Sequence, residues 1–215
     1  MSKAKDIVLK PISSQSANAF VIQNHYSGKV VNNSKLHFGV FLGNQLGGVL
    51  SFGSPMDKRK VLGIVEGTKW HDMLELNRMA FSDLLPRNSE SRALAIAMRL
   101  IRKNYPNIEW ILSYADGTKC GDGTIYRAAG FLLTQIRVNK TIILTPWGET
   151  IADLVLNLTE SLKRREVMQR LGLKDDGSVS IKRFMDAGCK PLEGYMLRYI
   201  YFINKGAASR LRAIC

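Results

Sequence analysis

The stretch Tyr114-Ala115-Asp116-Gly117, followed after a short loop by Gly123-Thr124-Ile125-Tyr126-Arg127-Ala128-Ala129-Gly130-Phe131, decides the fold. It predicts a strand that ends in an acidic turn, a short helix that Gly130 terminates, and a further strand that Phe131 opens. Because open sheets bind ligands at the carboxyl ends of their strands, Asp116 and Tyr126 are candidates for proton transfer there. The competing interpretations are an Asx turn at Asp116 and a core position for Tyr126.

The sequence on both sides of this stretch predicts an α/β protein with a mixed sheet flanked by helices. Strands are expected at 6–11, 36–42, 46–52, 73–81, 108–114, 131–144 and 195–202, with a short one at 61–65. Helices are expected at 14–24, 90–103, 121–129, 151–162 and 180–187, capped by Ser13 or Ser14 at the first and by Ser89 at the second. Alternation breaks at Asn77-Arg78, which indicates a bulge. We expect one domain, 1–215, with a basic helical insertion at 150–190 before the final strand.

The composition indicates a polyanionic partner. The chain has 31 Lys and Arg against 18 Asp and Glu, a net charge of +13, and such an excess favours nucleic acid, although a solubilising surface is the competing explanation. Residues 161–215 hold twelve basic and five acidic residues. No apolar run is long enough for a membrane span or a signal peptide. The three cysteines lack zinc or redox spacing, so we expect a soluble protein of the reducing cytoplasm.

A candidate anion site lies at Leu85-Pro86-Arg87-Asn88-Ser89-Glu90-Ser91-Arg92, between a predicted strand and a predicted helix. A helix start presents backbone amides and the positive end of a dipole, which favour a phosphate. Arg78, Arg87 and Arg92 add positive charge. The competing interpretation is a capped helix with surface arginines.

A second candidate is the pair His25-Tyr26 at the end of the first predicted helix. Histidine is easily tuned near neutral pH, although a structural role is the more common one for such a pair. His37 and His71 form no close-spaced pattern with His25, so no metal site is expected.

These residues together resemble the GNAT acyltransferase superfamily. Its pyrophosphate-binding turn corresponds to Arg87–Arg92 and its tyrosine segment to Tyr126–Phe131, although Asn88-Ser89-Glu90-Ser91 departs from the glycine-rich pattern of that turn. A narrower resemblance, to the Mom DNA-modification proteins of Mu-like phages, covers roughly residues 7–144. It rests on His25-Tyr26-Ser27, Leu74-Glu75-Leu76-Asn77-Arg78-Met79-Ala80, the Leu85–Arg92 turn, Ser113-Tyr114-Ala115-Asp116 and Gly123-Thr124-Ile125-Tyr126.

The Mom resemblance implies an enzyme that converts adenine in duplex DNA to a carbamoylmethyl (glycinamide-bearing) form. It implies that phage DNA is thereby protected from restriction in the cytoplasm of the bacterial host. By motif position, the functional residues are His25, Tyr26, Arg78, Ser91, Asp116 and Tyr126. The acyl donor is expected at Arg87, Asn88, Ser89, Ser91 and Arg92. We expect a flipped target base and phosphate contacts from Lys58, Arg59, Lys60, Lys163, Arg164 and Arg165.

The donor is open between acetyl-CoA and glycyl-tRNA, and tRNA would then be a second partner. Acetyl transfer gives an acetamide, so that route needs a further nitrogen and an oxidation, for which iron(II) is a candidate that no residue spacing supports. Glycyl transfer gives a glycyl amide, whose amine can attack the purine ring carbon and expel the amide nitrogen. Two other functions compete: a conventional GNAT N-acetyltransferase acting on a small amine or protein, and a non-enzymatic DNA-binding protein with a helix-turn-helix at 164–187.

Overall fold

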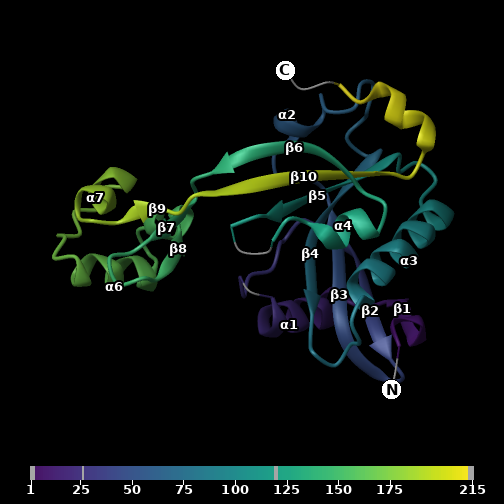
Figure 1. The fold of residues 1–215 in the computed structure, drawn as a ribbon, viewed down its shortest axis with the longest axis horizontal. Helices are drawn as coiled ribbons and strands as arrows, with labels where there is room; N and C mark the ends of the chain where they lie inside the picture. The colour runs from purple at the N-terminus through teal and green to yellow at the C-terminus, as the bar shows by residue number, and fades with distance from the viewer. Residues whose placement is uncertain (1–2, 26, 119–120, 213–215) are drawn as a thin grey trace. The chain divides into compact units, whose positions relative to one another are not determined.

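The computed structural model describes residues 3–25, 27–118 and 121–212, and the chain forms two compact units (Figure 1). The first unit comprises residues 1–114, 123–135 and 198–215, and the second comprises 115–122 and 136–197. The expected insertion lies inside the second unit, and a single domain over 1–215 stays a prediction. Of the described helices, none combines the length and apolar character that a membrane span requires.

A seven-stranded mixed sheet, in the order β1-β2-β3-β4-β5-β10-β6, confirms the predicted fold class. The strands are β1 (Ile7–Pro11), β2 (Ser34–Leu42), β3 (Gln45–Gly53), β4 (Met73–Phe81), β5 (Trp110–Asp116), β6 (Leu132–Asn139) and β10 (Gly194–Phe202). Neighbours from β1 to β4 are antiparallel, whereas β4 and β5 are parallel. The single strand expected at 131–144 is wrong. Asn139 Oδ1 accepts hydrogen bonds from the amide and hydroxyl of Thr141, and this turn separates β6 from β7 (Ile142–Leu144).

The helices of the first unit begin at polar caps. The helix α1 (Ser14–Asn24) starts at Ser13, whose Oγ accepts the amide of Ser16 at 3.1 Å, as expected. The short strand expected at 61–65 is wrong: Asp57 caps the short helix α2 (Lys58–Val61). The other helices are η1 (Ala4–Asp6), α3 (Ser89–Asn104), α4 (Thr124–Ala128) and η2 (Lys205–Arg210). The helix expected at 121–129 is therefore shorter, because Gly123 in the left-handed region precedes it.

The strand β4 carries the predicted bulge. Its register pairs Ser51 with Arg78 and Phe52 with Leu76, which leaves Asn77 as the extra residue. The parallel ladder with β5 runs only from Met73 to Glu75, although β4 continues to Phe81. The two central strands therefore stop pairing at Glu75, and the second half of β4 is bonded on the β3 side.

The second unit is built on a small sheet and three helices. Its strands are β7, β8 (Thr150–Ala152) and β9 (Lys190–Pro191), and its helices are α5 (Asp153–Asn157), α6 (Leu162–Arg170) and α7 (Ile181–Asp186). The single helix expected at 151–162 is wrong, because residues 150–152 pair with β7 and Ser161 caps a new helix, α6. Ten residues separate α6 from α7, whereas a helix-turn-helix has three or four, so the helix-turn-helix expected at 164–187 is wrong.

Candidate functional site

Arg78 anchors the polar cluster on β4, immediately after the bulge. Its Nε donates to the carbonyl of Lys29 at 2.7 Å, and a terminal nitrogen donates to the carbonyl of Asn77 at 2.7 Å. The first bond ties β4 to the segment that follows α1. Two backbone acceptors thus fix the guanidinium plane, and its charge acts on the neighbouring titratable groups.

His25, at the end of α1, is held in one neutral form. Its Nδ1 accepts the backbone N–H of Ser27 at 3.2 Å and lies 2.8 Å from the Ser27 hydroxyl. Because the amide donates to Nδ1, the ring proton belongs on Nε2. Burial, helped by the charge of Arg78, lowers the pKa of His25 to about 4. His25 is therefore uncharged at neutral pH. Tyr26, expected to act with it, lies outside the described residues.

Glu75 is the functional candidate that sequence reasoning missed. Burial raises the pKa of its carboxyl to about 7, although Arg78 and a hydrogen bond from the Met56 backbone oppose the shift. Glu75 pairs with Gly53 on β3 and is the last residue of the β4–β5 ladder. An acid with such a pKa, at the point where the central strands part, is a candidate for acid–base chemistry. The available signal was a lone carboxylate inside the apolar run Met73-Leu74-Glu75-Leu76.

The predicted anion site lies at the start of α3, with one correction. Asn88, not Ser89, is the cap, whereas Ser89 is buried and its hydroxyl donates to the carbonyl of Pro86 at 2.6 Å. The Ser91 hydroxyl donates to the carbonyl of Asn88 at 3.3 Å. Asn88 has φ = 71° and is the one non-glycine residue with positive φ in the part of the chain that the structure describes. Asparagine tolerates this conformation, so the turn forms without a glycine.

The conformation of Asn88 predicts opposite effects for two substitutions. Asn88→Ala is expected to lower the free energy of unfolding by about 1 kcal/mol, because a Cβ without a compensating polar group is strained there. Asn88→Gly should not lower it. Denaturant unfolding of both variants measures this, and an equal loss in both would contradict the left-handed turn.

Tyr126 sits in a helix end of the kind its sequence predicts. The amide of Phe131 donates to the Tyr126 carbonyl at 3.0 Å, and Gly130, at φ = 88°, donates to the carbonyl of Arg127 at 3.0 Å, which is a Schellman motif. The Tyr126 ring stacks on Tyr199 with centroids 5.2 Å apart and meets Phe131 edge-on at 5.6 Å. The side chain is only 8% exposed. It is thus part of an aromatic core, and its role as a proton donor stays a prediction.

Asp116 forms the turn that the competing interpretation describes. Its Oδ1 accepts the backbone N–H of Thr118 at 2.9 Å and the Asn139 side-chain amide at 3.1 Å. Asp116 belongs to the second unit, whereas Ser91 and Tyr126 belong to the first. That these three residues line one cavity stays a prediction.

Positive charge is concentrated in the first unit. That unit holds 20 Lys and Arg against eight Asp and Glu, whereas the second holds eleven against ten. Lys58, Arg59 and Lys60 are exposed on α2, as a DNA contact requires. The charge excess therefore comes from the unit with the large sheet, not from the helical insertion that the sequence emphasised.

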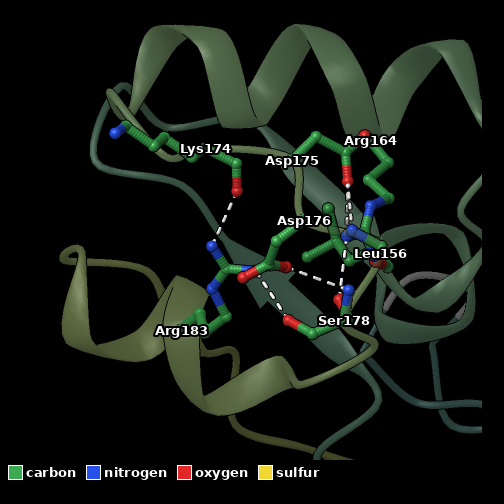
Figure 2. Close-up of polar contacts among 8 residues, drawn as sticks. Leu156, Arg164, Lys174, Asp175, Asp176, Ser178 and Arg183 are labelled. Carbon is green, nitrogen blue, oxygen red and sulfur yellow. Dashed lines mark hydrogen bonds and ion pairs between the residues drawn. The ribbon is translucent and has the colours of Figure 1, made fainter.

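The basic triplet of α6 divides between surface and core. Lys163 pairs with Glu149 at 2.6 Å and Glu166 at 3.0 Å, and Arg165 is exposed. Arg164 is fully buried and donates to the carbonyls of Leu156 and Ser178 at 2.9 Å each and to Asp175 at 3.3 Å (Figure 2). Its guanidinium ties the loop between α6 and α7 to the core. The structure therefore gives Arg164 a stabilising position inside the unit, while DNA contact by this triplet stays a prediction.

No set of three or more His, Cys, Asp or Glu side chains suited to a metal ion occurs among residues 3–25, 27–118 and 121–212. The charge of Arg78 acts on both His25 and Glu75, and Asn88, Ser89 and Ser91 lie together at the start of α3. These residues all belong to the first unit.

The fold is similar to that of a solved N-acetyltransferase. The structure matches spermidine/spermine N-acetyltransferase SpeG from Vibrio cholerae with a TM-score of 0.50 and 9% identity, over 96% of this chain and 98% of that chain. The chain belongs to the Mom protein family, whose model matches residues 6–214. It is 34% identical over 209 residues to methylcarbamoylase mom of Escherichia phage Mu, covering 97% of this chain and 80% of the relative.

Proposed function

We propose that this chain is a DNA-modifying transferase that converts adenine in duplex DNA to carbamoylmethyl adenine and so protects phage DNA from host restriction. The match to the Mom family over residues 6–214 carries this proposal. A GNAT-type sheet suits group transfer, and the 20 basic residues of the first unit suit a phosphate backbone.

The exocyclic amine of adenine needs help from the protein, since it is conjugated to the ring and stacked in the duplex. Extruding the base costs a few kcal/mol. Asp116, from the sequence, and Glu75, from the structure, are the two carboxylates that we propose for accepting the amine proton. Arg78 stabilises a developing oxyanion or a phosphate. Ser91 and the start of α3 hold the donor, and Tyr126 protonates the leaving group.

The product discriminates between the two donors. With glycyl-tRNA, the adenine amine forms an amide bond to the carbonyl carbon of the glycyl group, and the ester bond to the tRNA breaks. The proton that the amine loses passes to the carboxylate that acts as general base. The free glycyl amine then bonds to the purine ring carbon through a five-membered cycle, and the bond from that carbon to the original nitrogen breaks. The result is a carbamoylmethyl amine, with no change in oxidation state. Acetyl-CoA would need a nitrogen source and an oxidant, although both donors offer phosphates to the start of α3.

Expression of the chain in bacteria is expected to add a glycinamide group to a fraction of the adenosines in cellular DNA. Mass spectrometry of the digested nucleosides measures it, with the empty vector as the control. Absence of the modified nucleoside would refute the function. Glycine label in both carbons of the carbamoylmethyl group and in the nitrogen bonded to the purine ring supports the glycyl donor, whereas label from acetate alone contradicts it.

A further inference from the structure

The loop between β3 and α2 projects an apolar side chain into solvent. Met56 is 79% exposed, the highest fraction among the large apolar side chains that the structure describes as exposed. A single exposed apolar residue is ordinary on a protein surface, so its surroundings decide whether it has a function.

The backbone around Met56 is fixed. The Asn33 side-chain amide donates to the carbonyl of Ser54, just before Met56. Asp57, just after it, accepts the amides of Arg59 at 3.0 Å and Lys60 at 3.3 Å. Gly53, three residues before Met56, pairs with Glu75 in the β3–β4 ladder. The side chain is therefore held out by an anchored loop.

The charges around this loop suit a nucleic acid. Lys58, Arg59 and Lys60 begin two residues after Met56 and are exposed. Lys58 Nζ lies 5.6 Å from the centre of the Trp70 ring, and Lys60 pairs with Asp57 at 3.1 Å in an exposed position, where such a pair is weak. Exposed cations of this kind neutralise phosphates. An apolar side chain beside them matches the wedges, methionine among them, that proteins insert between base steps.

We propose that Met56 enters the DNA duplex and occupies the space left by the extruded adenine, while the cations of α2 hold the flanking phosphates. This inference rests on the proposed function. Glu75 pairs with Gly53, three residues before Met56, so the loop that carries the wedge starts beside a carboxylate proposed for the chemistry. The residue that opens the duplex and the carboxylate that accepts a proton from the adenine amine are then close to each other on the protein.

The chain supplies a matched control. Leu162 is 78% exposed and precedes Lys163, but it lies in the second unit. Met56→Ala and Leu162→Ala remove similar exposed apolar groups, and neither disturbs a core. Met56→Leu keeps an apolar wedge of similar volume.

Two measurements test the wedge separately from the chemistry. In cells, Met56→Ala is expected to lower the modified adenine content by about tenfold or more, since unstacking costs a few kcal/mol, whereas Met56→Leu and Leu162→Ala stay close to the unsubstituted protein. In solution, 2-aminopurine replaces the adenines of a duplex one position at a time. The unsubstituted protein should raise its fluorescence at one or more positions, and Met56→Ala should lose most of that rise while still binding by anisotropy.

The outcomes separate the two proposals. Modified adenine without a fluorescence rise at any position overturns the wedge and leaves the function standing. A fluorescence rise that requires Met56, without modified adenine, supports the wedge and refutes the chemistry. A Met56→Ala variant with full fluorescence and full modification, or an equal loss in Leu162→Ala, overturns the wedge.

Discussion

Glu75→Gln is expected to lower the rate of adenine modification by about a hundredfold, a magnitude typical of a lost general base, and to abolish the dependence of the rate on pH near neutrality. The carboxylate is the active form, so activity is full above the raised pKa of about 7 and falls as the pH drops through it. His25 does not cause this fall in activity, because its pKa is lowered to about 4 and its ring stays neutral at pH values near 7. Rates in host extract, which supplies the donor, measure the profile.

Asp116→Asn is the matched control for Glu75→Gln. The substituted side chain keeps an oxygen acceptor for the amide of Thr118, so the turn is preserved while the negative charge is lost. If the fall in rate near neutral pH persists in Glu75→Gln and disappears in Asp116→Asn, the general base is Asp116 and the assignment to Glu75 is wrong.

Arg164→Leu is expected to lower the free energy of unfolding by about 2–4 kcal/mol, because two backbone carbonyls lose their donor, at about 1–3 kcal/mol for each unsatisfied buried group, whereas the Asp175 side chain is 40% exposed. The substitution leaves the carbonyls of Leu156 and Ser178 and the carboxylate of Asp175 without their donor. Denaturant unfolding measures the loss, and limited proteolysis of the loop at 174–180 shows its origin.

Arg165→Leu provides the comparison, because Arg165 is an exposed neighbour on the same helix. It should change stability by about 0.5 kcal/mol or less. If Arg164→Leu unfolds like the unsubstituted protein but binds DNA more weakly, Arg164 contacts DNA and its buried role is refuted.

Most of the large sheet could be predicted from the sequence, because its strands alternate and end at turn residues. The bulge at Asn77 and the cap at Ser13 were predicted from local patterns, and both are present. The prediction of one helix over residues 151–162 was wrong, because the apolar spacing there fits a helix although the chain divides into β8, α5 and α6. Leu154 and Leu158 are 64% and 48% exposed, so the apolar stripe there is not a core face. Ser161, a cap within that stretch, was the neglected signal.

The site was harder to predict, since its chemistry depends on burial. The raised pKa of Glu75 and the lowered pKa of His25 both arise mainly from desolvation, which no local pattern reports. Arg164 appeared to be a surface cation because its neighbours Lys163 and Arg165 are basic. Its partners Asp175 and Ser178 follow more than ten residues later, and only the folded loop brings them to it.

The extra residue in β4 determines which side of the sheet its two charges share. In a regular strand, residues three apart point in opposite directions. Here Glu75 pairs with Gly53 and Arg78 pairs with Ser51, two positions that point the same way on β3. Asn77 is the unpaired residue of the bulge, and it allows Glu75 and Arg78, three positions apart, to face the same side of the sheet. A regular strand with these same residues and no bulge would carry the acid and the guanidinium on opposing surfaces, separated by the backbone layer itself.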